Sequence, residues 1–438
     1  MRIAILLPVY WPAIGGCEIH TRELVNQLSR RHHVEVITAI SKDEDKERGK
    51  WFMWSPLLAA PPRPEQYEDG RVRVTRVGLP VWLKMYLYFL LRIGGTEKLP
   101  QGLCRWAAKY FVAGYKRQLR KVVGKPDLIH GIHQDCAWFG YAALQLANEL
   151  GIPYAYTPVS HIYSTDKAIA GEYAVEGPAA SPDLPPVLRG IFGKMFLHTC
   201  GGANVVFTMT DAEKLFLEKQ KINDNVHTIG VGPVLSPRPA PDVRNTFGIP
   251  ADSPLILFLG RINLAKGVAI VLQATDMVWQ EAPDAYFLFV GPFERGSEAI
   301  FASRRDRRVI TTGAVDLEQK TGALQACDLL CLPSVNESLG GVYLEAWSFG
   351  KPVVGATIPP FQELTGNGQG GVAVEPTPEG VARGILSLLQ NREFGRRMGE
   401  WGRARVRSQY SWEMIAGKVE ACYGEILREQ HGSAEATS

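Results

Sequence analysis

The segment LILFLGRINLAKG, which spans Leu255–Gly267, decides the fold class because it leads from a strand through a polar turn into a helix. Five consecutive apolar residues, Leu255–Leu259, predict the strand, and the apolar spacing within Gly267–Trp279 predicts the helix. A strand that is followed at once by a helix is the repeating unit of a parallel sheet with helices on its faces. The segment therefore predicts an α/β fold.

The same alternation extends from this segment toward both ends of the chain. Before it, the predicted strands are Ile3–Leu7, Val34–Thr38, Leu128–His130, Tyr154–Thr157 and Val205–Thr208, with helices at Cys17–Arg31 and Tyr141–Leu150. After it, strands are predicted at Tyr286–Val290, Val309–Thr311, Leu329–Leu332, Val353–Gly355 and Val372–Val374, with helices at Val342–Phe349, Pro378–Gln390 and Trp412–Glu429.

A stretch rich in Pro and Gly, Gly230–Pro250, interrupts the alternation and is typical of a hinge. The chain has 438 residues, which is too long for one ordinary core. We therefore expect two doubly wound, Rossmann-like domains, residues 1–232 and 233–411, that face each other across a cleft. A ligand is expected where the carboxyl ends of the strands meet that cleft.

The composition is that of a folded protein, with 46% hydrophobic and 21% charged residues. Seven cysteines at unrelated positions give no disulfide framework and favour reduced, buried thiols. The apolar run Ile3–Leu7 is too short for a signal peptide. The most lipid-like stretch, Val81–Ile93, falls short of the roughly 20 residues that a spanning helix needs. We expect a cytoplasmic protein that does not cross a membrane.

Positive charge is concentrated in residues 71–125. This segment has thirteen Lys or Arg and one acidic residue, Glu97, so its charge is +12, and the remainder of the +3 chain sums to −9. Such a concentration favours a surface for an anionic partner. No recognised nucleic-acid-binding module accompanies the charge, so we do not expect nucleic acid as the partner.

Two strand-to-helix turns carry groups that suit a phosphate. Gly15 and Gly16 follow the first strand, where glycines let a ligand approach the backbone and helix N–H groups favour an anion. A simple tight turn explains these glycines equally well. Arg261 offers a planar fork and Lys266 a compact charge in the turn before the Gly267–Trp279 helix. Taken alone, these two side chains are explained slightly better as solvated charges on a surface turn.

A third turn, NESLGGVYLEA from Asn336 to Ala346, carries two acidic residues. The N–H groups of Leu339, Gly340 and Gly341 lie at a helix start, where they can meet a phosphate. Glu337 can bind sugar hydroxyls and Glu345 a ribose diol. The alternative for Glu337 is a capping or surface carboxylate. Glu345 lies in an otherwise apolar helix and so needs a partner.

Histidines and acidic runs give little support for a metal. His161 follows a predicted strand, at the carboxyl end that faces the expected cleft, yet a lone histidine there is more often structural than catalytic. His130 and His133 have no third ligand at a suitable spacing. The run Asp43–Asp45 matches a metal-carrying DxD signature, but it sits among mixed charges and is expected to be solvated.

Together these motifs resemble glycosyltransferase family 4, also called group 1, whose members are retaining enzymes of GT-B fold. The resemblance extends over nearly the whole chain. It rests on the E-x7-E element Glu337–Glu345 with its internal Gly340, on the Gly260–Gly267 turn, on Thr157–His161, on Gly15 and Gly16 with Glu18 and His33, and on the segments Cys327–Leu329, Pro333–Ser334, Gly350–Val353 and Tyr410–Trp412. The hinge departs from the family's usual Asn-Gly-Val-Asp, since this chain has Gly-Val-Gly-Pro at 230–233.

The resemblance implies a hexosyltransferase whose first domain binds an acceptor and whose second binds a nucleotide-sugar donor without a metal or other cofactor. In it, Arg261 and Lys266 would hold the pyrophosphate, helped by backbone near Gly16 and Leu339–Gly341. The base contacts would lie near Val315. Glu345 would bind ribose, and Glu337 and His161 would be the catalytic pair beside the transferred sugar. The helix at 412–430 would pack back on the first domain.

The acceptor is expected to be a glycan, a lipid-linked molecule or a small molecule, as in the synthesis of cell-envelope polysaccharides. Since acceptors bind the first domain in this fold, the basic segment 71–125, which also carries aromatic residues, suits docking on an anionic membrane face. Ordinary amphipathic helices with solvated basic faces explain it equally well. Two other functions remain open: a nucleotide-sugar epimerase or phosphorylase of the same fold, and a non-catalytic donor-binding subunit.

Overall fold

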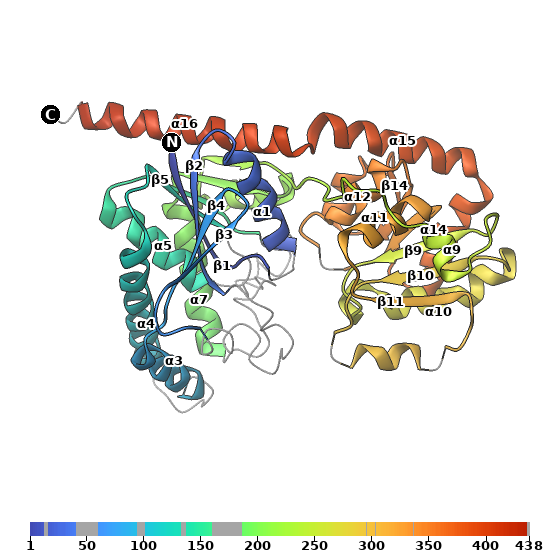
Figure 1. Cartoon of the computed structure of the whole chain (residues 1–438), viewed down its shortest axis with the longest axis horizontal. Coiled ribbons are helices and arrows are strands. Elements are labelled where there is room, and N and C mark those ends of the chain that lie inside the picture. Colours follow the sequence, from blue (N-terminus) through green and yellow to red (C-terminus); the bar gives the residue numbers. More distant parts are fainter. Residues whose placement is uncertain are drawn as a thin grey trace. The chain divides into compact units, whose positions relative to one another are not determined.

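The computed structural model describes residues 1–12, 16–40, 60–93, 101–132, 137–159, 186–294, 296–302, 304–335 and 337–435. These residues form two compact α/β units, Met1–Gly230 with Trp412–Ser438, and Val231–Ser411 (Figure 1). Gly15, His133 and His161, together with Asp43–Asp45, lie outside the described residues.

The first unit is built on an eight-stranded sheet in the order β3-β4-β2-β1-β5-β6-β7-β8. Its strands are β1 Arg2–Val9, β2 His33–Ile40, β3 Glu65–Asp69, β4 Val72–Arg76, β5 Leu128–Ile132, β6 Tyr154–Thr157, β7 Val205–Thr208 and β8 Val226–Thr228. Every neighbouring pair is parallel except β3 and β4 at the edge. The helices are α1 Gly16–Leu28, α3 Val81–Ile93, α4 Gln101–Val122, α5 Ala137–Leu150, α7 Pro186–Gly202, α8 Asp211–Lys219 and α16 Trp412–Glu435.

The last helix, α16, closes the core of this unit against α1 and β7. Ile415, Val419 and Tyr423 are buried on its inner face. The Tyr423 hydroxyl lies 2.6 Å from Nδ1 of His130, and the Thr157 hydroxyl lies 2.7 Å from Nε2 of the same ring. Because both ring nitrogens of His130 have hydroxyl partners, this buried histidine joins β5 to β6 and α16 and acts as a structural residue.

The second unit contains a six-stranded, fully parallel sheet in the order β11-β10-β9-β12-β13-β14. Its strands are β9 Leu255–Leu259, β10 Tyr286–Val290, β11 Val309–Gly313, β12 Leu329–Leu332, β13 Val353–Ala356 and β14 Gly371–Val374. Its helices are α9 Val243–Phe247, α10 Val268–Glu281, α11 Leu317–Ala326, α12 Gly341–Ser348, α13 Pro359–Leu364, α14 Pro378–Gln390 and α15 Arg392–Gln409, with short 3₁₀ turns at Leu264–Lys266 and Ser297–Phe301.

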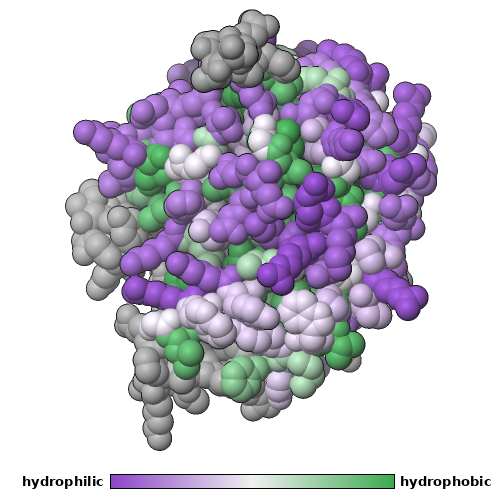
Figure 2. All heavy atoms as spheres, turned by 90° about the vertical axis from the view of Figure 1, so that its left-hand side faces the viewer, coloured by the Kyte–Doolittle hydropathy of each residue, from purple (hydrophilic) through white to green (hydrophobic). Residues whose placement is uncertain are grey.

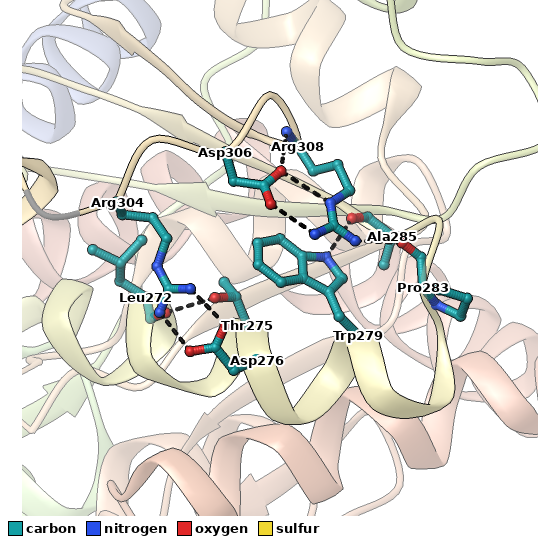
Figure 3. Close-up of polar contacts among 9 residues, drawn as sticks. All are labelled: Leu272, Thr275, Asp276, Trp279, Pro283, Ala285, Arg304, Asp306 and Arg308. Atoms are coloured by element: carbon teal, nitrogen blue, oxygen red, sulfur yellow. Dashed lines mark hydrogen bonds and ion pairs between the residues drawn. The ribbon is translucent and has the colours of Figure 1, made fainter.

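An aromatic and ionic cluster joins α10 to the segment that leads into β11 (Figure 3). The Arg308 guanidinium carbon lies 3.7 Å from the centre of the Trp279 ring, and Arg308 also pairs with Asp306, whose pKa it lowers to about 2. Arg304 pairs with Asp276 through Nη2 and Oδ2, 2.7 Å apart. The Trp279 indole N–H donates to the Ala285 carbonyl at 2.8 Å. This cluster fixes α10 against the segment that leads into the amino end of β11.

The expected α/β architecture of two Rossmann-like sheets is confirmed. The strands that were not predicted are β3, β4 and β8, at or next to the edges of the first sheet, and β3, whose residues EQYED are polar, is antiparallel to β4. The helices that were not assigned from the sequence are α3, α4, α7, α8, α9, α11, α13 and α15. Within the described parts of the chain, no helix is long and apolar enough to cross a membrane.

Candidate functional site

The carboxyl ends of β9 and β10 are joined by an unusually close backbone contact. Gly260 has φ 151° and Gly291 has φ 143°, and a Cβ on Gly291 would lie 1.9 Å from the Gly260 carbonyl oxygen. The Gly260 N–H donates to the Val290 carbonyl at 3.0 Å. Gly291 therefore has no room for a side chain, whereas at Gly260 it is the positive φ that favours glycine. Arg261, which follows directly, is exposed and makes no hydrogen bond or ion pair with another described residue.

Lys266 is held by the turn that precedes α10. The Asn263 side chain caps this turn by accepting from the Lys266 N–H at 2.9 Å, and Gly267 leaves it with φ 78°. The Lys266 ammonium donates to Oε1 of Glu337 at 2.6 Å. Both side chains are mostly buried, with exposed fractions of 20% and 10%. Two predicted site residues that are 71 positions apart in sequence are thus brought into direct contact.

The turn from β12 into α12 depends on a glycine in the left-handed region of the backbone. Gly340 has φ 84°, and a Cβ there would lie 2.5 Å from the Tyr343 ring. The Tyr343 hydroxyl donates to the Leu332 carbonyl at 2.6 Å, which anchors the helix to its strand. The Leu339 side chain is buried, so only its backbone can meet a ligand. Gly341 begins α12, where the first N–H groups of a helix have no partner within the helix.

Glu345, in α12, is a buried carboxylate with one paired and one unpaired oxygen. Its Oε1 accepts from Nζ of Lys320 at 2.7 Å and from the Val234 N–H at 3.3 Å. Its Oε2 is buried and has no hydrogen-bond partner among the described residues. A buried carboxylate oxygen without a donor is costly, so this atom marks a place where a ligand's hydroxyl would be stabilising.

Lys320 is the functional residue that the sequence reasoning missed. It lies in α11, five positions after the half-buried Val315, and its ammonium is a partner of the kind that Glu345 was expected to need. Lys320 is the only Lys or Arg within Leu317–Ala326, but nothing in the sequence points from it to Glu345. Its contact with Glu345 spans 25 positions and required the packing of α11 near α12 to be known.

The second unit therefore brings together most of the predicted donor-site residues. Arg261 and Lys266 follow β9, Val315 follows β11, and the Glu337–Gly341 turn and Glu345 follow β12. Since these strands are parallel, their carboxyl ends lie at one edge of the sheet. That edge combines guanidinium and ammonium groups with two carboxylates, a set that suits an anionic ligand rich in hydroxyl groups.

In the first unit, Gly16 is exposed at the start of α1, and no atom lies within 4 Å of a Cβ built on it. Asp69, at the end of β3, joins Arg22 of α1 to Tyr10, which follows β1. Asp69 accepts two hydrogen bonds from Arg22, at 2.9 and 2.8 Å, and one from the Tyr10 hydroxyl at 3.1 Å. Arg22 also stacks on the Trp11 ring, 3.9 Å from its centre. Sequence reasoning did not single out this group.

The described histidines, cysteines and acidic residues give no candidate metal centre. Among those parts of the chain, no group of three or more such side chains is arranged to hold a metal ion. The buried Cys200, Cys327 and Cys331 are free thiols, and burial raises their pKa. Raised thiol pKa values favour inert core residues over nucleophiles or ligands.

Family comparisons match both units of the chain. The sequence pattern described as "Glycosyl transferases group 1" matches residues 240–405, and that described as "Glycosyl transferase 4-like domain" matches residues 15–232. The chain is 28% identical over 345 residues to D-inositol 3-phosphate glycosyltransferase of Segniliparus rotundus, which covers 76% of this chain and 72% of that protein. It is 31% identical over 186 residues to phosphatidyl-myo-inositol mannosyltransferase of Mycobacterium tuberculosis, covering 41% of this chain and 49% of that protein.

Solved structures agree on the fold. The sucrose-phosphate synthase of Thermosynechococcus elongatus superposes with a TM-score of 0.70 at 21% identity, over 98% of this chain and 100% of that one. The Anabaena protein HepE in complex with UDP-glucose superposes with a TM-score of 0.64 at 16% identity, over 97% and 100%. These likenesses establish the two-domain GT-B architecture.

Proposed function

Because this chain belongs to the group 1 glycosyltransferase family, we propose that it moves a hexose from a nucleotide-sugar donor to an acceptor with retention of the anomeric configuration and without a metal ion. Transfer of a sugar follows from the family. The donor site, the stereochemistry and the metal independence are the parts proposed here, with the second unit binding the donor and the first unit the acceptor.

The observation that carries the donor-site proposal is the unpaired Oε2 of Glu345 at the sheet edge where Arg261 and Lys266 also lie. A ribose diol supplies two O–H donors, which is the chemistry that this buried carboxylate oxygen lacks. The Lys320 ammonium keeps the other oxygen occupied and the carboxylate oriented. The ribose would therefore be bound by Glu345, with the base near Val315.

Charge that develops on the leaving diphosphate would be met by fixed groups of the protein. Arg261 is exposed and unpaired within the described chain, and the Lys266 ammonium, which donates to Glu337, would lie close to the phosphates. The backbone N–H groups of Leu339, Gly340 and Gly341 add to this positive edge. Preorganised cations and N–H dipoles of this kind stabilise a leaving anion in place of a metal ion.

The transferred sugar would lie against Glu337. This carboxylate is buried and is held by Lys266, so it can accept hydrogen bonds from sugar hydroxyls without moving. His161 is the second residue proposed beside the reacting sugar, on the sequence grounds given above. The acceptor is proposed to be a glycan, a lipid-linked molecule or a polyol phosphate, because relatives include a D-inositol 3-phosphate glycosyltransferase and a phosphatidyl-myo-inositol mannosyltransferase.

Thermal stabilisation tests the donor site. Purified protein is screened with UDP, GDP, ADP, CMP and their sugar conjugates, with and without EDTA. A ligand at a hundred times its Kd stabilises by about 2.7 kcal/mol, which a melting shift detects readily. We expect one nucleotide to stabilise the protein equally in EDTA, and Arg261→Ala to remove the shift.

The matched control is Arg307→Ala, which removes an exposed arginine from the segment before the amino end of β11, at the opposite edge of the sheet. It should leave the shift unchanged. Stabilisation that requires a divalent metal, or no stabilisation by any nucleotide, would contradict the proposed site. Retention is checked separately by NMR of the first product formed, whose anomeric configuration should equal that of the donor.

A further inference from the structure

The outward face of α3 consists of apolar and aromatic side chains. Val81, Trp82, Met85, Tyr88 and Phe89 are between 45% and 65% exposed. Their spacing places them on one side of the helix, while Leu83 and Leu87 on the opposite side are fully buried in the core. A helix that is apolar on its solvent side as well as its core side is unusual in a globular protein and indicates a binding surface.

The exposed apolar face continues onto α4. Leu103, Trp106 and Tyr110 are exposed there, and the rings of Trp106 and Tyr110 stack with centres 5.6 Å apart. Tyr86 of α3 reaches the Tyr110 ring at 4.9 Å and donates to the Ala107 carbonyl at 3.2 Å. The two helices are therefore locked together, and their exposed residues form what we term the α3–α4 surface: Val81, Trp82, Met85, Tyr88, Phe89, Leu103, Trp106 and Tyr110.

Both helices are basic and lack acidic residues. Within Val81–Ile93 and Gln101–Val122 there are eight Lys or Arg and no Asp or Glu. Arg105 and Lys109 are exposed beside Trp106, and Arg117, Arg120 and Lys121 are exposed farther along α4. Figure 2 shows this side of the molecule, where pale and green side chains gather along the lower edge and strongly hydrophilic ones lie above them.

We propose that the α3–α4 surface docks the protein on an anionic lipid bilayer, with the aromatic and apolar side chains in the headgroup region and the cations against acidic headgroups. Trp and Tyr favour this interface because one part of each ring is apolar and another is polar. A helix of 13 residues is too short to span a bilayer, so α3 would lie in its plane. Docking itself rests on these side chains alone, whereas its use, to reach a lipid-linked acceptor, rests on the proposed function.

Charge argues for a lipid bilayer over a second copy of the chain. Two copies meeting through the α3–α4 surface would oppose two helix pairs that carry only positive charge, which is unfavourable. An anionic bilayer instead complements the cations, and each Lys or Arg near its surface contributes enough to change binding about fivefold. The oligomeric state of the protein is therefore one of the outcomes that the test must record.

Co-sedimentation with vesicles tests the proposal. The full chain is mixed with phosphatidylcholine vesicles, with or without phosphatidylglycerol, at low and high salt. We expect binding only to the mixed vesicles, and weaker binding at high salt.

Arg105→Gln with Lys109→Gln should lower the partition coefficient about 25-fold. Trp82→Gln, Met85→Gln and Phe89→Gln together should lower it more than about 100-fold. The control Leu215→Gln changes a leucine of α8 that is 49% exposed and should have no effect.

A second measurement identifies which side chains enter the lipid. Brominated acyl chains quench tryptophan fluorescence at short range, and Trp82 and Trp106 are both exposed on the surface. Trp82→Phe with Trp106→Phe should bind vesicles nearly as well as the wild type but lose the quenching. Unchanged quenching in this variant, or equal binding to neutral and anionic vesicles, would overturn the proposal.

The remaining outcomes separate this inference from the proposed function. If nucleotides stabilise the protein but vesicles do not bind it, docking is wrong and the donor site stands. If vesicles bind but no nucleotide does, docking stands and the donor site fails. A dimer in sedimentation equilibrium that Trp82→Gln, Met85→Gln and Phe89→Gln dissociate would show that a second copy occupies the surface, which also overturns docking.

Discussion

Glu345 shows how the proposed donor site differs from an ordinary ion pair. In the described chain one oxygen is satisfied by Lys320 and Val234 and the other is buried without a donor. A purely structural pair would have both oxygens satisfied, because an orphaned buried acceptor costs about 1–3 kcal/mol. The orphan is thus explained most simply by a ligand that supplies the missing hydroxyl.

Replacement of this carboxylate gives a prediction with an internal control. Glu345→Gln should weaken binding of the stabilising nucleotide about tenfold to a hundredfold, since hydrogen bonds to a charged group contribute about 1.5–3 kcal/mol. The wild type should bind the 2′,3′-dideoxy form of that nucleotide correspondingly weakly. The variant should bind both forms alike, as measured by calorimetric titration. Full discrimination by the variant would show that Glu345 does not contact the ribose.

Among the elements, the strands of the second sheet depend on glycines whose structural role cannot be read from the amino-acid composition. Gly291, after β10, faces the Gly260 carbonyl so closely that a Cβ would lie 1.9 Å from it. Gly296, a few residues on, also has a positive φ, of 84°, but a Cβ built there meets nothing within 4 Å. The two positions therefore separate a steric requirement from a purely conformational one.

We expect Gly291→Ala to destabilise the second unit by more than about 3 kcal/mol, because backbone must move and Arg261 follows the displaced strand. Gly296→Ala should cost about 1 kcal/mol, from the positive φ alone. Denaturant unfolding followed by circular dichroism measures both values, and nucleotide binding by the folded fraction reports the displacement of Arg261. Equal costs for the two substitutions would contradict the steric account.

Prediction from sequence was most accurate for strands whose residues are all apolar and buried. β9 is LILFL, buried at every position, and its predicted bounds equal the observed ones. α15 was missed because its buried face consists largely of glycines, which a search for regularly spaced apolar side chains does not detect. A Cβ on Gly399 would lie 1.8 Å from the Gly350 carbonyl, and one on Gly402 would lie 2.2 Å from the Trp347 ring. β3 was missed for a related reason, since an edge strand needs no apolar run.

The candidate site was predictable as a set of turns but not as a set of contacts. Apart from Gly15 and Gly16, each predicted donor-site residue follows a strand of the second sheet, and parallel topology places those strand ends at one edge. The pairing of Lys266 with Glu337 and of Lys320 with Glu345 depends on how the turns and helices pack. Sequence spacing carries no signal for such contacts, because each joins segments that belong to different strand–helix units.

At the scale of the whole molecule, the first and last parts of the sequence share one core. His20, in α1, is buried, and its ring centre lies 5.3 Å from that of Trp412 at the start of α16. Neither ring nitrogen has a hydrogen-bond partner among the described residues. Burial lowers the pKa of His20 from 6.5 to about 4. The packing of α16 on α1 therefore holds this ring in its neutral form.

Acid should weaken this unit through His20. The folded pKa is the lower one, so between pH 6.5 and 4 the unfolded chain binds the extra proton and stability falls as the pH falls. From pH 7 to pH 5 this amounts to about 2 kcal/mol for one histidine with that shift.

His20→Phe, which cannot titrate and leaves no orphaned nitrogen, should be as stable as the wild type at pH 7 and about 2 kcal/mol more stable than it at pH 5. Unfolding by denaturant at both pH values measures the difference, with exposed His198→Phe as control. The difference in the free energy of unfolding between His20→Phe and the wild type should thus be larger at pH 5 than at pH 7. If it is not, α16 releases the ring for protonation before the unit unfolds.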